Sequence, residues 1–318
     1  MIVRAVHFIM LIALWLMHLP CIRAQDAIFS QYYASPIYLN PAFTGTGAGS
    51  RIVMNYRNQP FPRLGTFSTI NVSYDTDLPS VNSGLGLIVT SDHQGGLLMR
   101  NNISAVYAYH LQAGEKLFIN FGAQAGYYRK DLNWNNLTFA DADEPPPEET
   151  WNHASNFAAG LLIHSDWYYA GLSAHHLNRP RESFYGNHRL PIKYTAHMGM
   201  YVEPSQQRRA NTLPFNYFIS PNLIVQNQGE YYRINYGFYA GIESLMAGVW
   251  YRQDLNNPNT IIFLVGLSLD NYRIGYSYDY SLSGYSSATH GAHELSVAIY
   301  FHDPKRNLRE RILNCPRF

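Results

Sequence analysis

The sequence has little charge, almost no cysteine and no long apolar run in its body. Only 14% of its 318 residues are Asp, Glu, Lys or Arg, against about 25% in typical soluble domains. Cysteine occurs twice, at Cys21 and Cys315. Cleavage of the N-terminal signal expected below would remove Cys21, and the single remaining cysteine could not form an internal disulfide. The formal net charge of +1 argues against nucleic acid as a partner, because nucleic-acid binding requires a basic surface.

What the sequence has instead is aromatic side chains. They make up 15% of the residues and include 26 tyrosines, while the mean hydropathy is −0.23. After the N-terminal region, no 18 consecutive residues are apolar, so we expect no spanning helix. Few charges, many tyrosines and middling hydropathy are typical of a β-barrel that is apolar outside and wet inside. A large tyrosine-rich soluble β-protein is the alternative.

The N-terminus resembles an export signal. Arg4 provides a basic start, residues 8–17 form a short apolar core, and Ala24 ends a plausible cleavage site. We therefore expect residues 1–24 to be a signal peptide. An exported chain without a spanning helix is periplasmic, secreted or an outer-membrane barrel.

The stretch 271–301 favours the barrel. Tyr272, Ile274 and Tyr276 begin a row of apolar residues at every second position, with polar or small residues between them, as in a strand with two different faces. A second alternating run, 289–301, follows a turn-rich segment and ends on aromatic residues. Each run is about 10 residues long, the length that a tilted transmembrane strand needs. We interpret the pair as the closing hairpin of the barrel.

Similar runs recur along the chain and predict an all-β fold, a transmembrane antiparallel barrel of about 14 strands over residues 50–301. The candidate strands are residues 50–58, 66–76, 81–91, 97–111, 115–129, 153–164, 166–177, 192–203, 213–225, 229–240, 242–252, 259–269, 271–281 and 289–301. Pro221 interrupts one of them. Long connections such as 59–65, 130–152 and 178–191 alternate with short ones, which is typical of outer loops and periplasmic turns. The connection 204–212 departs from this rule.

Two segments lie outside the predicted strands. Residues 25–49 contain prolines and glycines but also many apolar and aromatic groups, so they are expected to form a plug in the barrel or a periplasmic docking strip. Residues 302–318 form a polar tail, which we expect in the periplasm.

No sequence motif indicates catalysis, a cofactor or a metal. His290 and His293 are three residues apart, and His175 and His176 are adjacent, so on a strand each pair should face opposite sides. The acidic loop 141–149 holds five carboxylates and three prolines. Its carboxylates could bind calcium, but a solvated, semi-rigid loop is the simpler interpretation. A barrel hydrolase with Ser and His on neighbouring strands would leave no local motif.

Several blocks in order resemble the PorP/SprF family of outer-membrane proteins. The blocks are residues 29–33 (FSQYY), 39–45 (LNPAFTG), 55–59 (NYRNQ), 83–87 (SGLGL), 134–141 (WNNLTFAD) and 315–318 (CPRF). The resemblance implies a non-enzymatic component or accessory of the type IX secretion system that supports gliding and the secretion or surface attachment of adhesins. The implied partners are periplasmic ring and lipoprotein components, a secreted adhesin or cargo protein, and outer-membrane lipid.

An alternative follows from residues 40–42 (NPA), which also resemble the hatch of long-chain fatty-acid channels and suggest a transporter for a small hydrophobic solute. In either case, the N-terminal side chains expected to shape the plug or the partner contact are Phe29, Tyr32, Tyr33, Asn40 and Pro41. Alternation with apolar neighbours predicts that four arginines face the lumen, namely Arg51, Arg57, Arg233 and Arg273.

Overall fold

The computed structural model describes residues 26–47, 49–61, 65–136, 150–184, 187–203, 217–255, 259–282 and 291–301. The expectations for the signal peptide, the acidic loop and the C-terminal tail concern residues outside these ranges.

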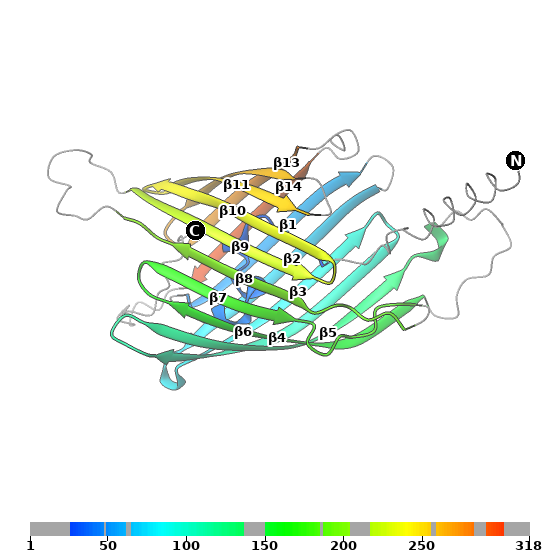
Figure 1. The fold of residues 1–318 in the computed structure, drawn as a ribbon, viewed down its shortest axis with the longest axis horizontal. Helices are drawn as coiled ribbons and strands as arrows, with labels where there is room; N and C mark the ends of the chain where they lie inside the picture. Colours follow the sequence, from blue (N-terminus) through cyan, green and yellow to red (C-terminus); the bar gives the residue numbers. More distant parts are fainter. Residues whose placement is uncertain are drawn as a thin grey trace, which may run out of the picture.

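The described chain forms a closed antiparallel barrel of fourteen strands in sequential order, in which β1 pairs with both β2 and β14 (Figure 1). The strands are β1 Ser50–Phe61, β2 Gly65–Leu78, β3 Ser83–Gln94, β4 Leu98–Gln112, β5 Phe118–Leu132, β6 Trp151–His164, β7 Tyr168–His175, β8 Lys193–Met200, β9 Tyr217–Gln228, β10 Tyr231–Ile242, β11 Leu245–Asp254, β12 Thr260–Ser268, β13 Tyr272–Ser281 and β14 Ala292–Phe301. The predicted fold class and strand number are confirmed. Among the described helices, none is long and apolar enough to cross a membrane.

Successive side chains of each strand alternate between the two sides of the wall. On β13, Tyr272, Ile274, Tyr276 and Tyr280 are exposed on the outside, where they form part of an aromatic and aliphatic belt. The inward positions are largely polar, as in other transmembrane barrels. The buried charged residues of the strands are Arg51, Arg57, Asp75, Asp92, Lys130, Arg252, Asp254, Asp279 and Glu294.

The strands differ in length. β4 and β5 have 15 residues each, whereas β7 and β8 have 8. Pro221 lies within β9, which runs to Gln228 and is less interrupted than its sequence suggests. The backbone N–H of Ile219 donates to Val202, which lies on the β8 side of β9. Backbone N–H groups two residues apart on a strand point to the same side. The missing N–H of Pro221 therefore faces the end of β8 at Met200, so the ladder bond that proline cannot donate falls at the last residue of that strand.

The connections 133–150, 176–192 and 282–291 leave the barrel at the same end, where odd-numbered strands finish and even-numbered strands begin. We call this the long-loop end. The connection between β1 and β2, predicted over residues 59–65, is shorter than predicted, because β1 continues to Phe61 and β2 already begins at Gly65. On the opposite end, the connection 201–216 is long, as the sequence indicated.

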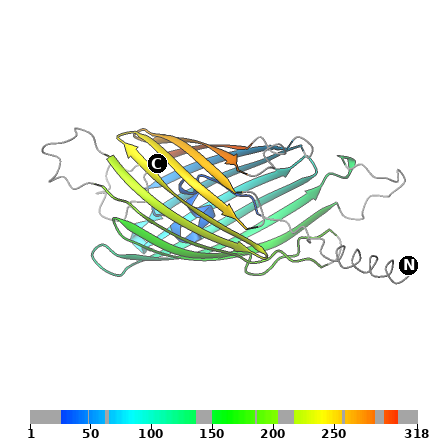
Figure 2. The ribbon, with the colours of Figure 1, turned by 45° about the horizontal axis from the view of Figure 1, so that its top comes forward.

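Residues 26–47, here called the inner segment, lie inside the barrel and appear in dark blue within the ring of strands (Figure 2). The segment contains three short helices, η1 Tyr32–Ala34, α2 Pro36–Leu39 and η2 Pro41–Phe43. Helix η2 packs against β4, β5 and β6, and η1 contacts β14. Two further short helices lie in connections, η3 Pro79–Val81 and η4 Trp134–Asn136.

Candidate functional site

The inner segment is the candidate site, because buried charged and polar groups of the wall converge on it. The first contact is at Ser30 and Gln31, whose backbone N–H groups donate to the two carboxylate oxygens of Glu294 at 2.7 and 3.0 Å. All three residues are at most 1% exposed. The carboxylate of β14 thus holds the start of η1 in one position.

Two arginines complete this cluster. Arg57 lies 2.8 Å from Asp279 and 3.4 Å from Glu294, and Arg252 lies 3.0 Å from Asp279. Both guanidinium groups also donate to the hydroxyl of Ser30, at 2.8 and 2.7 Å. Two cations therefore face two carboxylates, which is the condition under which buried charges are tolerated.

The second contact is at Asn40, which is completely buried. Its amide nitrogen donates to the backbone oxygens of Leu161 on β6 and Leu172 on β7, at 3.0 and 3.2 Å. Its side-chain oxygen accepts from the backbone N–H of Ala42 at 2.9 Å and so caps η2. One side chain therefore both starts a helix of the inner segment and ties it to the wall.

The third contact lies near the end of the barrel opposite the long-loop end. The N–H of Gly45 donates to Asp75 at 2.8 Å, and Arg51 pairs with the same carboxylate at 2.6 Å. Gly45 has a φ of +73°, which favours glycine. A Cβ atom on Gly84 of β3 would lie 2.3 Å from the backbone oxygen of Thr44, so glycine allows the inner segment to lie directly on the wall.

Aromatic packing fills the space between these polar contacts. Tyr32 lies 5.4 Å from Trp250, and Tyr33 lies 5.1 Å from Tyr239, measured between ring centroids. Phe29 is 3% exposed, and Pro41 is buried in η2. All five residues that we predicted from the sequence to shape a plug or a partner contact therefore lie in the inner segment within the barrel.

The four arginines singled out from the sequence lie on the inner side of the wall. Arg57 donates to Ser30 as described above, and Arg51 donates to the backbone oxygen of Phe43 at 3.4 Å. Arg233 pairs with Asp254 at 2.6 Å, and Arg273 donates to the hydroxyl of Tyr300 at 2.6 Å. The sequence reasoning missed their carboxylate partners, although Asp279 and Glu294 occupy the polar positions of alternating runs and carry that signal.

A further cluster surrounds Asp26 near the long-loop end. Asp26 lies 2.7 Å from His176, 3.2 Å from Arg100 and 3.6 Å from Lys193. Burial alone would raise the pKa of Asp26, but His176, Lys193 and Arg100 outweigh it and hold that pKa well below its ordinary value. The inner segment is thus bound electrostatically at this end as well.

The expectation that His175 and His176 face opposite sides is wrong. β7 ends at His175, and His176 adopts a left-handed conformation with φ +60°, which turns its ring to the same side. Both residues are buried, at 8% and 7% exposure. In the part of the chain that the structure describes, no group of three or more His, Cys, Asp or Glu side chains is placed to hold a metal ion.

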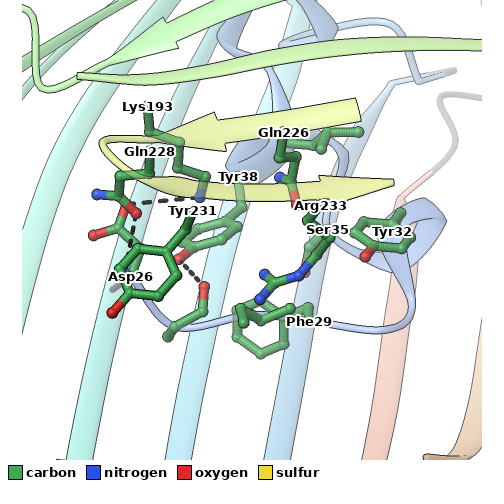
Figure 3. Close-up of a pocket in the computed structure, with 13 residues that line it drawn as sticks. Asp26, Phe29, Tyr32, Ser35, Tyr38, Lys193, Gln226, Gln228, Tyr231 and Arg233 are labelled. Carbon is green, nitrogen blue, oxygen red and sulfur yellow. Dashed lines mark hydrogen bonds and ion pairs between the residues drawn. The ribbon is translucent and has the colours of Figure 1, made fainter. Parts of the chain in front are cut away.

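A cavity lies between the inner segment and strands β8, β9 and β10 (Figure 3). Its empty volume is about 610 Å³, part of it open to solvent. Tyr38 and Phe29 line it from the inner segment, and Lys193, Gln228 and Arg233 line it from the wall. A second cavity of about 680 Å³ lies on the other side of Tyr38, against β3 to β8.

Two pairs of the sequence blocks that carry the resemblance to the PorP/SprF family meet in space. Ser30 of block 29–33 contacts Arg57 of block 55–59, and Thr44 of block 39–45 lies against Gly84 of block 83–87. These blocks therefore encode how the inner segment is seated in the barrel.

Solved structures share the barrel fold. The toluene transporter TodX of P. putida has 11% sequence identity, a TM-score of 0.50 and coverage of 83% of this chain and 93% of its own. The outer membrane protein Omp33 of Acinetobacter baumannii has 9% sequence identity, a TM-score of 0.44 and coverage of 80% of this chain and 100% of its own. At this identity the likeness concerns the fold alone. A search of curated proteins gave no match.

A family model described as type IX secretion system membrane protein PorP/SprF matches residues 22–299. A closed barrel with an apolar outer belt and a polar interior is the architecture of outer-membrane proteins, and this chain is one of them. Because the match covers well over half of its length, the protein belongs to the PorP/SprF family, as the ordered blocks predicted.

Proposed function

We propose that the protein is a non-enzymatic component or accessory of the type IX secretion system that supports gliding and the secretion or surface attachment of adhesin or cargo proteins. Its expected partners are periplasmic ring and lipoprotein components and a secreted adhesin. The match to the family model supports the assignment to the type IX secretion system. The observation that carries the mode of action is the inner segment, which is tied to the wall by buried hydrogen bonds to Glu294 and Asp75 and by the ion pairs of Asp26.

A lumen filled in this way favours a scaffold over a conduit. The inner segment is bonded to β1, β2, β6, β7 and β14, so its contacts reach strands on several sides of the barrel. A cargo protein passing through the same barrel would have to break each of these contacts. We therefore infer that the protein acts by holding partners at the membrane.

The test is a deletion strain together with a pull-down of the native barrel. We expect deletion to stop secretion or surface attachment of at least one cargo protein. We also expect periplasmic lipoproteins or a large adhesin to co-purify with the barrel. Normal secretion in the deletion strain, with no co-purifying protein, contradicts the proposal.

The transporter for a small hydrophobic solute is the second candidate, and the cavities beside the inner segment are the observation that favours it. Their lining, however, includes Asp26, Arg100, Lys193 and Arg233, and charged groups suit an apolar solute poorly. Loss of solute uptake in the deletion strain, with secretion intact, would favour this candidate over the scaffold.

A further inference from the structure

The two cavities form one region at the long-loop end. They share a partition made of Asp26, Ala27, Tyr38 and Lys193. Several of the other lining residues come from the ends of odd-numbered strands and the starts of even-numbered strands, among them Asp92, Arg100, His175, Gln228 and Tyr231. Both cavities therefore lie toward the mouth that carries the longest connections, which in bacterial barrels faces the outside of the cell.

The cations that line this region already have anionic partners. Arg100 contacts Asp26 and Glu182, Lys193 lies 3.6 Å from Asp26, and Arg233 lies 2.6 Å from Asp254. Because these cations are balanced by carboxylates of the inner segment, the connection 176–192 and the wall, the region has no strong preference for an ionic ligand.

What remains unsatisfied is neutral hydrogen-bonding capacity. Among the described residues, the Oε1 atom of Gln124 and the Nε2 atom of Gln228 have no hydrogen-bond partner, nor does the Nε atom of Arg100. Gln124 and Gln228 are each 8% exposed and line the two cavities. A buried polar group without a partner is destabilising, so a ligand that supplies both donors and acceptors would be bound here.

Aromatic rings complete the lining. Tyr38 is fixed by a hydrogen bond from its hydroxyl to the backbone oxygen of Ala27 at 2.9 Å and by the edge-on ring of Phe29 at 5.2 Å. Tyr128 lines one cavity and Tyr231 the other. Rigid aromatic side chains with polar tips provide apolar contact area beside hydrogen-bonding groups.

We propose that this region binds a neutral, polyhydroxylated ligand, a short carbohydrate, which enters from the long-loop end. Each hydroxyl group both donates and accepts a hydrogen bond, so sugar hydroxyls can donate to the amide oxygen of Gln124 and accept from the amide nitrogen of Gln228 and from the Nε–H of Arg100. The C–H faces of a sugar ring can lie against the tyrosines. An apolar solute would leave the same polar atoms unpaired.

The experiment uses the full chain purified in lauryldimethylamine oxide, since maltoside detergents carry a sugar. The labelled barrel is applied to an array of neutral glycans, and the glycan retained most strongly is then titrated by calorimetry. We expect saturable binding that is about five- to tenfold weaker in Gln124→Ala and in Gln228→Ala, the usual effect of losing one hydrogen bond. Gln112→Ala, which removes an exposed amide at the other end of β4, should bind like the unmodified protein.

Folding of each variant is checked by its mobility shift on heating, and Gln124→Met preserves side-chain volume if the alanine variant is unstable. Retention of no neutral glycan would overturn the proposal. So would undiminished binding by both glutamine variants, or competition for the site by toluene or by trialanine in place of sugars. Because binding is measured on the isolated barrel, failure here leaves the proposed role in secretion untouched, and the reverse is also true.

Discussion

At the scale of single residues, Glu294 has the largest predicted effect on stability. Its carboxylate accepts from two backbone N–H groups of the inner segment and faces Arg57. We expect Glu294→Ala to lower the free energy of unfolding by about 3–5 kcal/mol, because it leaves a buried cation with one fewer partner. Urea titration in detergent micelles measures this. Lys116→Ala removes the exposed pair with Asp166 and should change stability by less than about 1 kcal/mol; equal effects would contradict the argument.

Gly122 on β5 tests how closely the inner segment approaches the wall. A Cβ atom there would lie 2.2 Å from the backbone nitrogen of Ala42, and backbone cannot move aside as a flexible side chain can. We expect Gly122→Ala to destabilise the barrel by about 1–3 kcal/mol, as measured by thermal unfolding. At Gly114 the nearest atom is 3.6 Å away, so Gly114→Ala should be neutral or slightly stabilising. Two neutral variants would show that the inner segment is not seated on β5.

The carboxylate of Asp26 makes the seating of the inner segment dependent on pH. Folding lowers the pKa of Asp26, so its contribution is complete above the unfolded pKa of about 4 and is lost as pH falls through the folded value. We expect hydrogen exchange at residues 26–28, after correction for the intrinsic rate, to accelerate as pH falls below about 4. Asp26→Asn should remove this acid transition. An unchanged transition in that variant would assign it to another group.

At the scale of elements, periodicity alone located the wall. Each strand of the barrel overlaps a run predicted from the sequence, and where the structure describes both the predicted and the observed boundary they differ by at most three residues, as at β1, which continues to Phe61 and not to residue 58. Alternation also assigns a side of the wall to each position, as at Arg57 and Glu294. It fails at His176, because a single left-handed residue after β7 reverses the parity.

The inner segment was less predictable, for a physical reason. Its apolar composition indicated burial but left a plug and a docking strip as equal alternatives. The contacts that seat it join residues 263 and 264 positions apart, as between Gln31 or Ser30 and Glu294. Such pairs exist only after the barrel has closed, and no local pattern in the sequence specifies them.

Deleting the inner segment should convert the barrel into an open pore. The segment contacts several strands across the lumen, and the inward face that it leaves behind is largely polar, so water and ions would fill the space. We expect low conductance of the full chain in planar bilayers and a large increase for the variant that lacks residues 26–47. High conductance of the unmodified protein would contradict the view that the segment closes the barrel.

At the scale of the whole molecule, the question is whether the inner segment moves when the protein works. Ser35 donates to Asn55 on β1 at 2.5 Å, so cysteines at these two positions, in a Cys315→Ser background, are close enough for a short, reducible thiol cross-linker to fix the segment to the wall. If the barrel is a scaffold, secretion should continue in the cross-linked cells, because partners are held without opening the lumen. Cargo protein in the medium is the measurement, and a gel shift verifies the cross-link. Secretion that stops on cross-linking and returns with reductant would show that the segment must leave, and the scaffold would have to be replaced by a gated conduit.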